Sequence, residues 1–478
     1  MSFHFVDSQA ASKPGARTAI RRHVMKGKNL GRTIHGRGRK HALAQESGFF
    51  GDVSQLQKRG SHTPHEHDGI HDGIVIGYDG NPLLFPEIIP VDPMYSASNP
   101  FAGSEFAYFA FPVQFTSSMR YMVYQFHSAI CDAIYPYSFC RSTDEIGSPW
   151  FRFMISDQAF LHCLLAMAAT YLSLFRKPDC ETLEATSHFS QALRLVNCQL
   201  SQPTPPHDST IAVIVSLACH SKLIRDTPKS DMHLDGLQRI LDLRAGGLSE
   251  LRVSNRALMH KICRIDLDVA LTLGTRTRYG GAGLTAAAAG PVAARILAYP
   301  LNQMCETLRQ MTRELLALCR RPGRAKMTAL QYQDVLISLT QRLVDFAPLG
   351  GERPQDLLDD VWQLGLLAFL SMVNYSTSYI REINCGLLLG LLRDRVESRA
   401  LSARGLDYAP LRLWIIILYA LSLPDEDAES RPTAMIREVA QELKVRTWDD
   451  VKARLRPFPW IAVVQDAPGK RLWESVSS

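Results

Sequence analysis

The chain has 478 residues, of which 46% are hydrophobic and 21% are charged. This composition can build a large core, and it excludes a chain that is disordered along its whole length. The formal net charge is +6, but residues 1–40 alone hold ten basic residues and one acidic residue. The rest of the chain holds 43 basic and 46 acidic residues, so the excess of positive charge is confined to the front. Such asymmetry is typical of a tail with an acidic partner.

The basic segment runs from Lys13 to Lys40, and no carboxylate lies between Asp7 and Glu46. Clustered Lys and Arg side chains suit the acidic grooves of a nuclear import receptor. They also suit the phosphates of nucleic acid, and a solvated tail without a specific role is the third alternative. We favour import for a disordered arm over residues 1–45. The expected contact residues are Arg21, Arg22, Lys26, Lys28, Arg32, Arg37, Arg39 and Lys40.

Residues 46–112 are dense in Gly, Pro, His, Asp and Asn, which predicts a linker without long regular elements. The stretch from His62 to Asp72 resembles a metal-binding tract. A metal site needs rigid supporting contacts that a Gly/Pro-rich linker does not supply. We therefore expect no metal site and no cofactor.

From Val113 onwards the hydrophobic residues recur at three- and four-residue steps, which predicts helices. In residues 156–175, Ser156 or Asp157 stands where an N-cap is expected. Further predicted helices cover residues 182–202, 209–224, 231–246, 255–273, 300–321, 329–347, 359–375 and 411–423. Alternating strand patterns are nearly absent. The predicted fold is all-α, with one large multi-helix domain over residues 113–478 and a two-domain split as the alternative.

Ten cysteines are scattered along the chain, and no C-x-x-C pair occurs. Dispersed cysteines of this kind are typical of small core residues in a reducing compartment. The first residues lack the basic and apolar regions of a secretory signal. An uncharged window over residues 361–380 reaches membrane-spanning length, but its polar residues favour a buried helix. We expect an intracellular, soluble protein that does not bind membranes.

Asn374, Ser378 and Glu382 are spaced to lie on one face of a helix. They resemble one magnesium-binding motif of class I terpene synthases, which also require an aspartate-rich motif well upstream. The acidic pair Asp359–Asp360 is too close in sequence to supply it. Other catalytic motifs are absent, so we expect no enzyme. A magnesium-dependent helical enzyme and a cytoplasmic scaffold protein remain as alternatives.

Five stretches resemble the fungal-specific transcription factor domain, the helical regulatory region of Zn₂Cys₆-type regulators. They are RRHVMKGKNLGRT (21–33), DPMYSASNPFAG (92–103), FPVQFTSSMRYMVYQFHSAI (111–130), the segment 148–175, and HLDGLQRILDLRAGGL (233–248). The resemblance covers roughly residues 20–250, with a weaker continuation over 262–273. In the last stretch, Gly246 and Gly247 suit a left-handed helix stop.

Residues 1–130 contain no cysteine, whereas a Zn₂Cys₆ cluster needs six, so we expect a member that lacks this cluster. The resemblance implies a nuclear regulator of transcription, for a local group of metabolic genes such as those of secondary metabolism. It implies other transcription factors or co-regulators as partners, a homo- or heterodimer, and DNA contact that is weak and non-specific. A small-molecule pocket between helices would fit this class. Trp150, Phe151 and Phe153 are candidate partner contacts, although such aromatic clusters are more often core.

Overall fold

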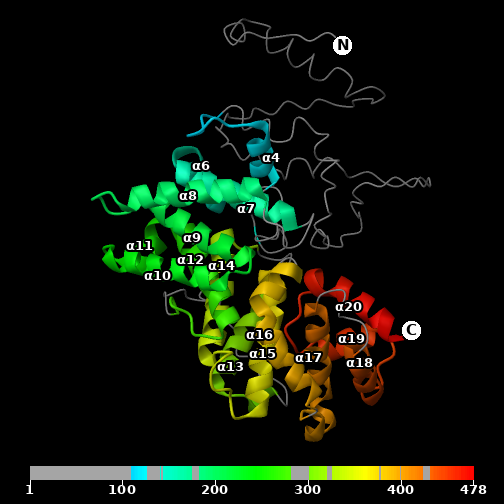
Figure 1. Ribbon diagram of the computed structural model, residues 1–478. Helices are drawn as coiled ribbons and strands as arrows, with labels where there is room; N and C mark the ends of the chain where they lie inside the picture. The colour runs from blue at the N-terminus through cyan, green and yellow to red at the C-terminus, as the bar shows by residue number, and fades with distance from the viewer. Residues whose placement is uncertain are drawn as a thin grey trace, which may run out of the picture. The chain divides into compact units, whose positions relative to one another are not determined.

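The computed structural model describes residues 109–125, 140, 144–174, 182–280, 301–319, 326–375, 378–398, 400–423 and 431–477. These residues form sixteen α-helices and three 3₁₀ helices, and their only pairing of extended backbone is the single bridge Cys140–Met327 (Figure 1). They all belong to one compact unit, Ile70–Ser478. The prediction of an all-α fold is confirmed.

The first helices in the chain are α4 (Ser117–Gln125), α6 (Asp144–Ser156), α7 (Gln158–Leu174), α8 (Leu183–Leu200), α9 (Asp208–Leu223), α10 (Thr227–Leu243), α11 (Gly247–Ser254) and α12 (Arg256–Leu273). They are followed by η5 (Leu301–Gln303), α13 (Glu306–Cys319), α14 (Ala329–Phe346), α15 (Leu357–Asn374) and α16 (Ser378–Glu397). The last elements are η6 (Ser402–Arg404), η7 (Leu406–Tyr408), α17 (Ala409–Ser422), α18 (Arg431–Glu442), α19 (Trp448–Leu455) and α20 (Ala462–Ser477). The nine segments predicted as helices correspond to α7–α10, α12–α15 and α17.

Helix ends form where the local sequence predicts them. The carboxylate of Asp157 accepts the N–H of Phe160 at 3.0 Å, so Asp157 caps α7. After α10, Gly246 and Gly247 have φ values of +79° and +51°, a left-handed conformation that other residues rarely adopt. The left-handed conformation is as predicted, but α10 already ends at Leu243 with Arg244 extended as its C-cap, and Gly246 is the N-cap of α11, which packs against α10.

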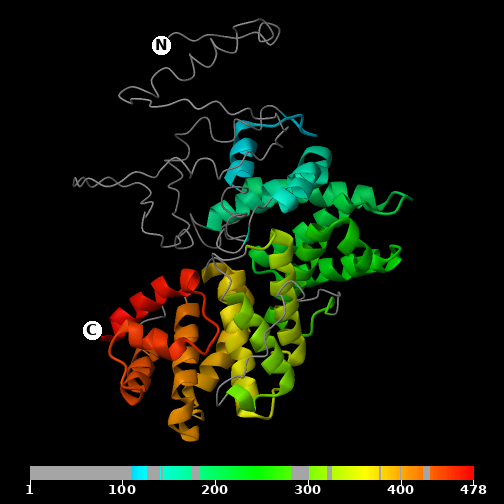
Figure 2. The same ribbon diagram turned by 180° about the vertical axis from the view of Figure 1, so that it is seen from behind.

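One continuous hydrophobic core extends from Met122 to Val476. In its first part α7 packs against α8 and α9, and α9 packs against α10 and α12 (Figures 1 and 2). Helix α12 then contacts α14 and α16, and α17 contacts α18, α19 and α20. Helix α15 is long and apolar enough to cross a membrane, but 83% of it is buried inside the protein. Its composition is that of a helix enclosed by other helices.

Aromatic rings fix the packing of α15 on α17. The rings of Trp362 and Trp414 lie 4.9 Å apart, and Phe458 stacks on Trp414 at 5.4 Å. Both indole N–H groups are satisfied, since Trp362 donates to Thr312 Oγ1 at 2.7 Å and Trp414 donates to the Pro459 carbonyl. Gly365 lies directly against these side chains, and a Cβ atom there would stand 2.7 Å from the Trp414 ring.

Substituting alanine for Gly365 should destabilise the protein. The added methyl group would displace Trp414, which is enclosed by other rings, so we expect the free energy of unfolding to fall by about 1–3 kcal/mol. Gly386 in α16 is exposed, and no atom lies within 4 Å of the place that a Cβ would take there, so Gly386→Ala is the matched control. It should raise stability by up to about 1 kcal/mol, because alanine favours helix. Urea denaturation of both variants checks this, and equal effects would contradict it.

Candidate functional site

Helix α12 is mostly buried, yet it carries polar side chains that reach several neighbouring helices. Asp334 of α14 is 3% exposed and accepts hydrogen bonds from Arg256 Nε at 3.1 Å and His260 Nε2 at 2.6 Å. Burial, with Arg256 and Arg264 nearby, lowers the pKa of His260 to about 3. His260 is therefore neutral, and its Nε2–H donates to a carboxylate whose charge Arg256 balances.

Arg264 lies one turn further along α12 and joins it to α14 and α15. Its guanidinium donates to Gln333 Oε1 at 3.0 Å and to the main-chain carbonyl of Asn374 at 3.2 Å. The second bond satisfies a carbonyl at the C-terminus of α15, where intrahelical partners run out. Lys261, on another side of α12, donates to Ser216 Oγ at 2.7 Å and lies 4.6 Å from the centre of the Trp150 ring.

Asp268 is the last of these polar residues of α12 and lies near the C-terminus of the helix. The hydroxyl of Tyr375 donates to its Oδ1 at 2.5 Å. Tyr375 is no longer helical: its φ of −120° and ψ of +111° are those of extended backbone, so it lies between α15 and α16. The hydrogen bond therefore fixes the break between the two helices against α12.

The prediction that Asn374, Ser378 and Glu382 lie on one face of a single helix is wrong. Asn374 is the last residue of α15, whereas Ser378 is the first residue of α16. The side-chain amide of Asn374 donates to Thr340 Oγ1 at 3.3 Å. The side chains of Ser378 and Glu382 lie outside the described part of the structure. The helical spacing on which a magnesium motif was based does not exist here, because Tyr375 interrupts the helix.

The eight basic residues predicted for import or phosphate contact lie outside the described residues. They are Arg21, Arg22, Lys26, Lys28, Arg32, Arg37, Arg39 and Lys40. The histidine-rich tract of the linker lies outside them as well. Within the described part of the chain, no group of three or more potential metal ligands occurs.

The aromatic cluster on α6 is part of the core. Phe151 is 8% exposed, and its ring meets Phe109 edge-on at 5.0 Å. Trp150 and Phe153 are partly buried and pack against Phe160 of α7. The core interpretation is confirmed for Phe151, whereas Trp150 and Phe153 pack against the core and stay partly exposed.

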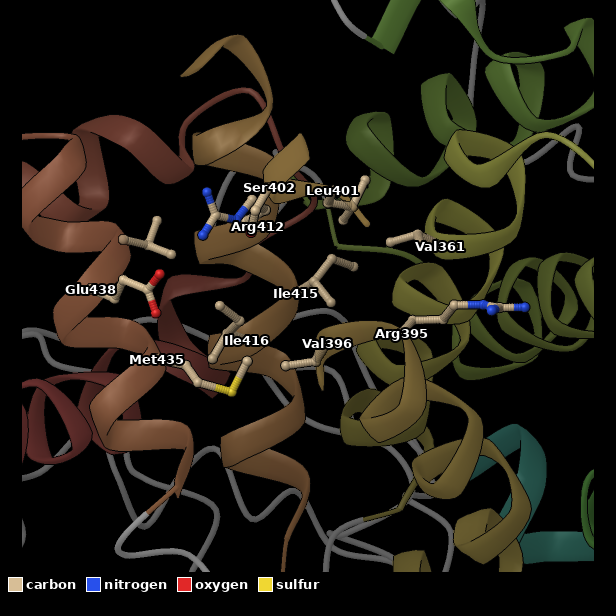
Figure 3. Close-up of a pocket in the computed structure, with 11 residues that line it drawn as sticks. Val361, Arg395, Val396, Leu401, Ser402, Arg412, Ile415, Ile416, Met435 and Glu438 are labelled. Carbon is tan, nitrogen blue, oxygen red and sulfur yellow. The ribbon is translucent and has the colours of Figure 1, made fainter. Parts of the chain in front are cut away.

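A cavity of about 20 Å³ lies between α15, α16, α17 and α18, and its lining is mainly apolar but includes Arg412 and Glu438 (Figure 3). Its walls include Val361, Val396, Ile415, Ile416 and Met435. Figure 3 shows the Arg395 guanidinium pointing away from these side chains, towards α15, where it pairs with Asp360. This volume accommodates about one water-sized group, which is too little for an organic ligand.

A larger cavity of about 80 Å³ lies between α9, α12 and α16 and is lined by polar as well as apolar residues. It includes Lys222 and Asp268, which the sequence motifs did not single out. The sequence does contain a sign of this site, a charge within an apolar helix. Lys222 is a charged residue inside the apolar segment 209–224, and Asp268 stands among the apolar residues of α12. A buried charge on such a helix marks a structural or functional site.

Residues 122–279 match the family described as the fungal specific transcription factor domain. The recognition drawn from the sequence is thus confirmed for this segment, which runs from α4 through α12 to Tyr279. The match supports a role in transcription regulation in general, and the family is a regulatory rather than a catalytic one. No curated protein and no solved structure matches the chain.

Buried histidines make the stability of this domain sensitive to acid. Burial lowers the pKa of His162 and of His220 to about 4, and the pKa of His260 to about 3, all below the ordinary 6.5. His162 and His188 share a hydrogen bond between their Nδ1 atoms at 2.9 Å, which needs one donor and one acceptor. Protonation of the acceptor ring at Nδ1 would break the pair, because both Nδ1 atoms would then carry a hydrogen.

We expect the protein to lose stability as the pH falls below 6.5. Under these conditions the unfolded chain binds protons that the folded histidines do not bind, and each such proton contributes a slope of about 1.4 kcal/mol per pH unit. His260→Gln should reduce this slope by the contribution of one proton, about 1.4 kcal/mol per pH unit. The control His207→Gln, at an exposed position, should leave it unchanged. Urea unfolding over a pH series measures the slopes, and an unaltered slope in the His260 variant would contradict the assignment.

Proposed function

We propose that this protein is a nuclear transcription regulator that acts by recruiting partner proteins through its helical body. The observation that carries the proposal is the match of residues 122–279 to the fungal specific transcription factor domain. In this proposal the basic arm provides import into the nucleus, and the genes under control are a local group of metabolic genes.

The charge distribution supports the role of the arm. Ten of the chain's 53 basic residues lie between Lys13 and Lys40, without a carboxylate among them. Import receptors bind such segments through acidic grooves. Phosphate contacts of the same segment would be sensitive to salt and tolerant of sequence, so they would add weak affinity for DNA rather than site selection. Residues 1–130 contain no cysteine to ligate zinc.

The helical body offers exposed apolar side chains that a partner would cover. Met232 and Leu243 lie three turns apart on one face of α10, and they are 59% and 89% exposed. Arg239 is exposed between them on the same face. Large apolar side chains in such positions stabilise protein–protein contacts when they are buried. Recruitment of other transcription factors or co-regulators, or dimerisation, would use a surface of this kind.

Removing three charges from the arm should reduce nuclear accumulation. We expect Arg37→Ala, Arg39→Ala and Lys40→Ala together to lower the nuclear-to-cytoplasmic ratio of a fluorescently tagged full-length protein several-fold. The matched control removes three exposed charges from the body, Arg446→Ala, Lys470→Ala and Arg471→Ala, and should leave the ratio unchanged. A wild-type protein that is excluded from nuclei would favour the cytoplasmic scaffold instead.

Partner recruitment is tested by tethering the full-length chain to a reporter gene through an added DNA-binding domain. Leu243→Arg should reduce the change in reporter expression several-fold, because a charge on α10 would oppose burial of this face. Leu183 of α8 is equally exposed at 91%, so Leu183→Arg is the control. Both variants should keep the wild-type unfolding temperature. An unchanged effect of the Leu243 variant on the reporter would rule out this face as the recruiting surface.

A further inference from the structure

The cavity between α9, α12 and α16 has opposite charges on its walls. Lys222 projects from α9 and is 4% exposed, whereas Asp268 projects from α12 and is partly buried. Among the described residues, these two side chains form no ion pair with each other, although both line the same space. Two opposite charges held apart across a cavity are costly unless something polar lies between them.

The bonds of Lys222 leave part of its donor capacity for an occupant. Its ammonium donates to Thr272 Oγ1 at 2.6 Å and more weakly to Thr227 Oγ1 at 3.4 Å. An ammonium group has three N–H donors, so one remains for an acceptor in the cavity. Burial lowers the pKa of Lys222, while the nearby Asp268 opposes this change and favours the charged form.

The acceptors of the cavity come from α12 and α16. Asn384 is 3% exposed, and its Oδ1 atom is buried without a hydrogen-bond partner among the described residues. Asp268 Oδ1 accepts from Tyr375, and its second oxygen has capacity for a further donor. A buried amide oxygen without a partner destabilises the folded protein, and a bound donor would remove this cost.

Aliphatic side chains form the remaining walls. They are Leu223 of α9, Ile265 of α12 and Ile383 of α16, and Cys219 of α9 lines the cavity beside them. The volume of about 80 Å³ accommodates several water-sized groups and is four times the volume of the cavity beside α17. A ligand that fills this space would be short, with a small alkyl group and two polar ends.

We propose that this cavity binds a small aliphatic 2-amino or 2-hydroxy acid, with its carboxylate facing Lys222 and its amino or hydroxyl group facing Asp268 and Asn384. The amino acid satisfies both charges at once, so it is the preferred form. Because α9 and α12 belong to the matched segment and α16 lies beyond it, the ligand would join the two parts of the core. The proposal concerns binding alone and does not depend on the regulatory function.

The test measures the unfolding temperature and the heat of binding of the full-length protein with millimolar L-alanine and L-lactate. We expect L-alanine to raise the unfolding temperature in a concentration-dependent way and to bind more tightly than L-lactate. Propionate and ethylamine each lack one polar end, so they should bind at least about tenfold more weakly than L-alanine. If neither L-alanine nor L-lactate binds, the cavity holds water only and the proposal is wrong.

Two variants separate a ligand site from a structural cluster. Asn384→Leu has nearly the same shape and removes an oxygen without a partner, so it should keep the unfolding temperature of the free protein but abolish the response to L-alanine. Lys222→Met should abolish it as well. The control Lys261→Met changes a lysine that contacts Ser216 and Trp150 outside the cavity, and it should bind as the wild type does. Wild-type binding by the Asn384 variant would overturn the proposal.

Discussion

The buried and partly buried polar side chains on α12 require partners, and this requirement constrains the helices around it. A charge that is removed from water costs several kcal/mol unless it is paired and hydrogen-bonded. His260 and Arg256 find their partner in Asp334 on α14, Lys261 finds Ser216 on α9, and Asp268 finds Tyr375 after α15. Apolar packing would allow these helices to slide or rotate, whereas directional bonds allow one arrangement.

The same bonds connect the segment that matches a known family with the helices that follow it. Arg264 and Asp268 lie in the matched segment, but both bind groups at the end of α15. The apolar core is likewise continuous across this junction, from Met122 to Val476. The cavity between α9, α12 and α16 lies at this junction, so a ligand bound there would contact both parts and stabilise them together.

Local features of the fold could be predicted from the sequence, and long-range ones could not. Helical periodicity located nine helices, and residues such as Asp157 and Gly246 marked their ends, because caps and left-handed turns depend on neighbours in the chain. The end of the helix predicted over residues 359–375 was correct, but the spacing of Asn374, Ser378 and Glu382 wrongly placed one helical face across the break at Tyr375. At this break Tyr375 donates a hydrogen bond to Asp268, which is 107 residues away. The cavity was missed because its lining residues come from α9, α12 and α16, which are far apart in the sequence.

The position of Tyr375 has a consequence for how the matched segment can be used. If residues 122–279 were excised and grafted onto another chain, Asp268 would lose its phenol partner and the apolar side of α12 would face water instead of α14 and α16. In this chain the end of the matched segment is therefore not the end of its packing unit. Transplanting the regulatory property into a new protein would require carrying the later helices with it.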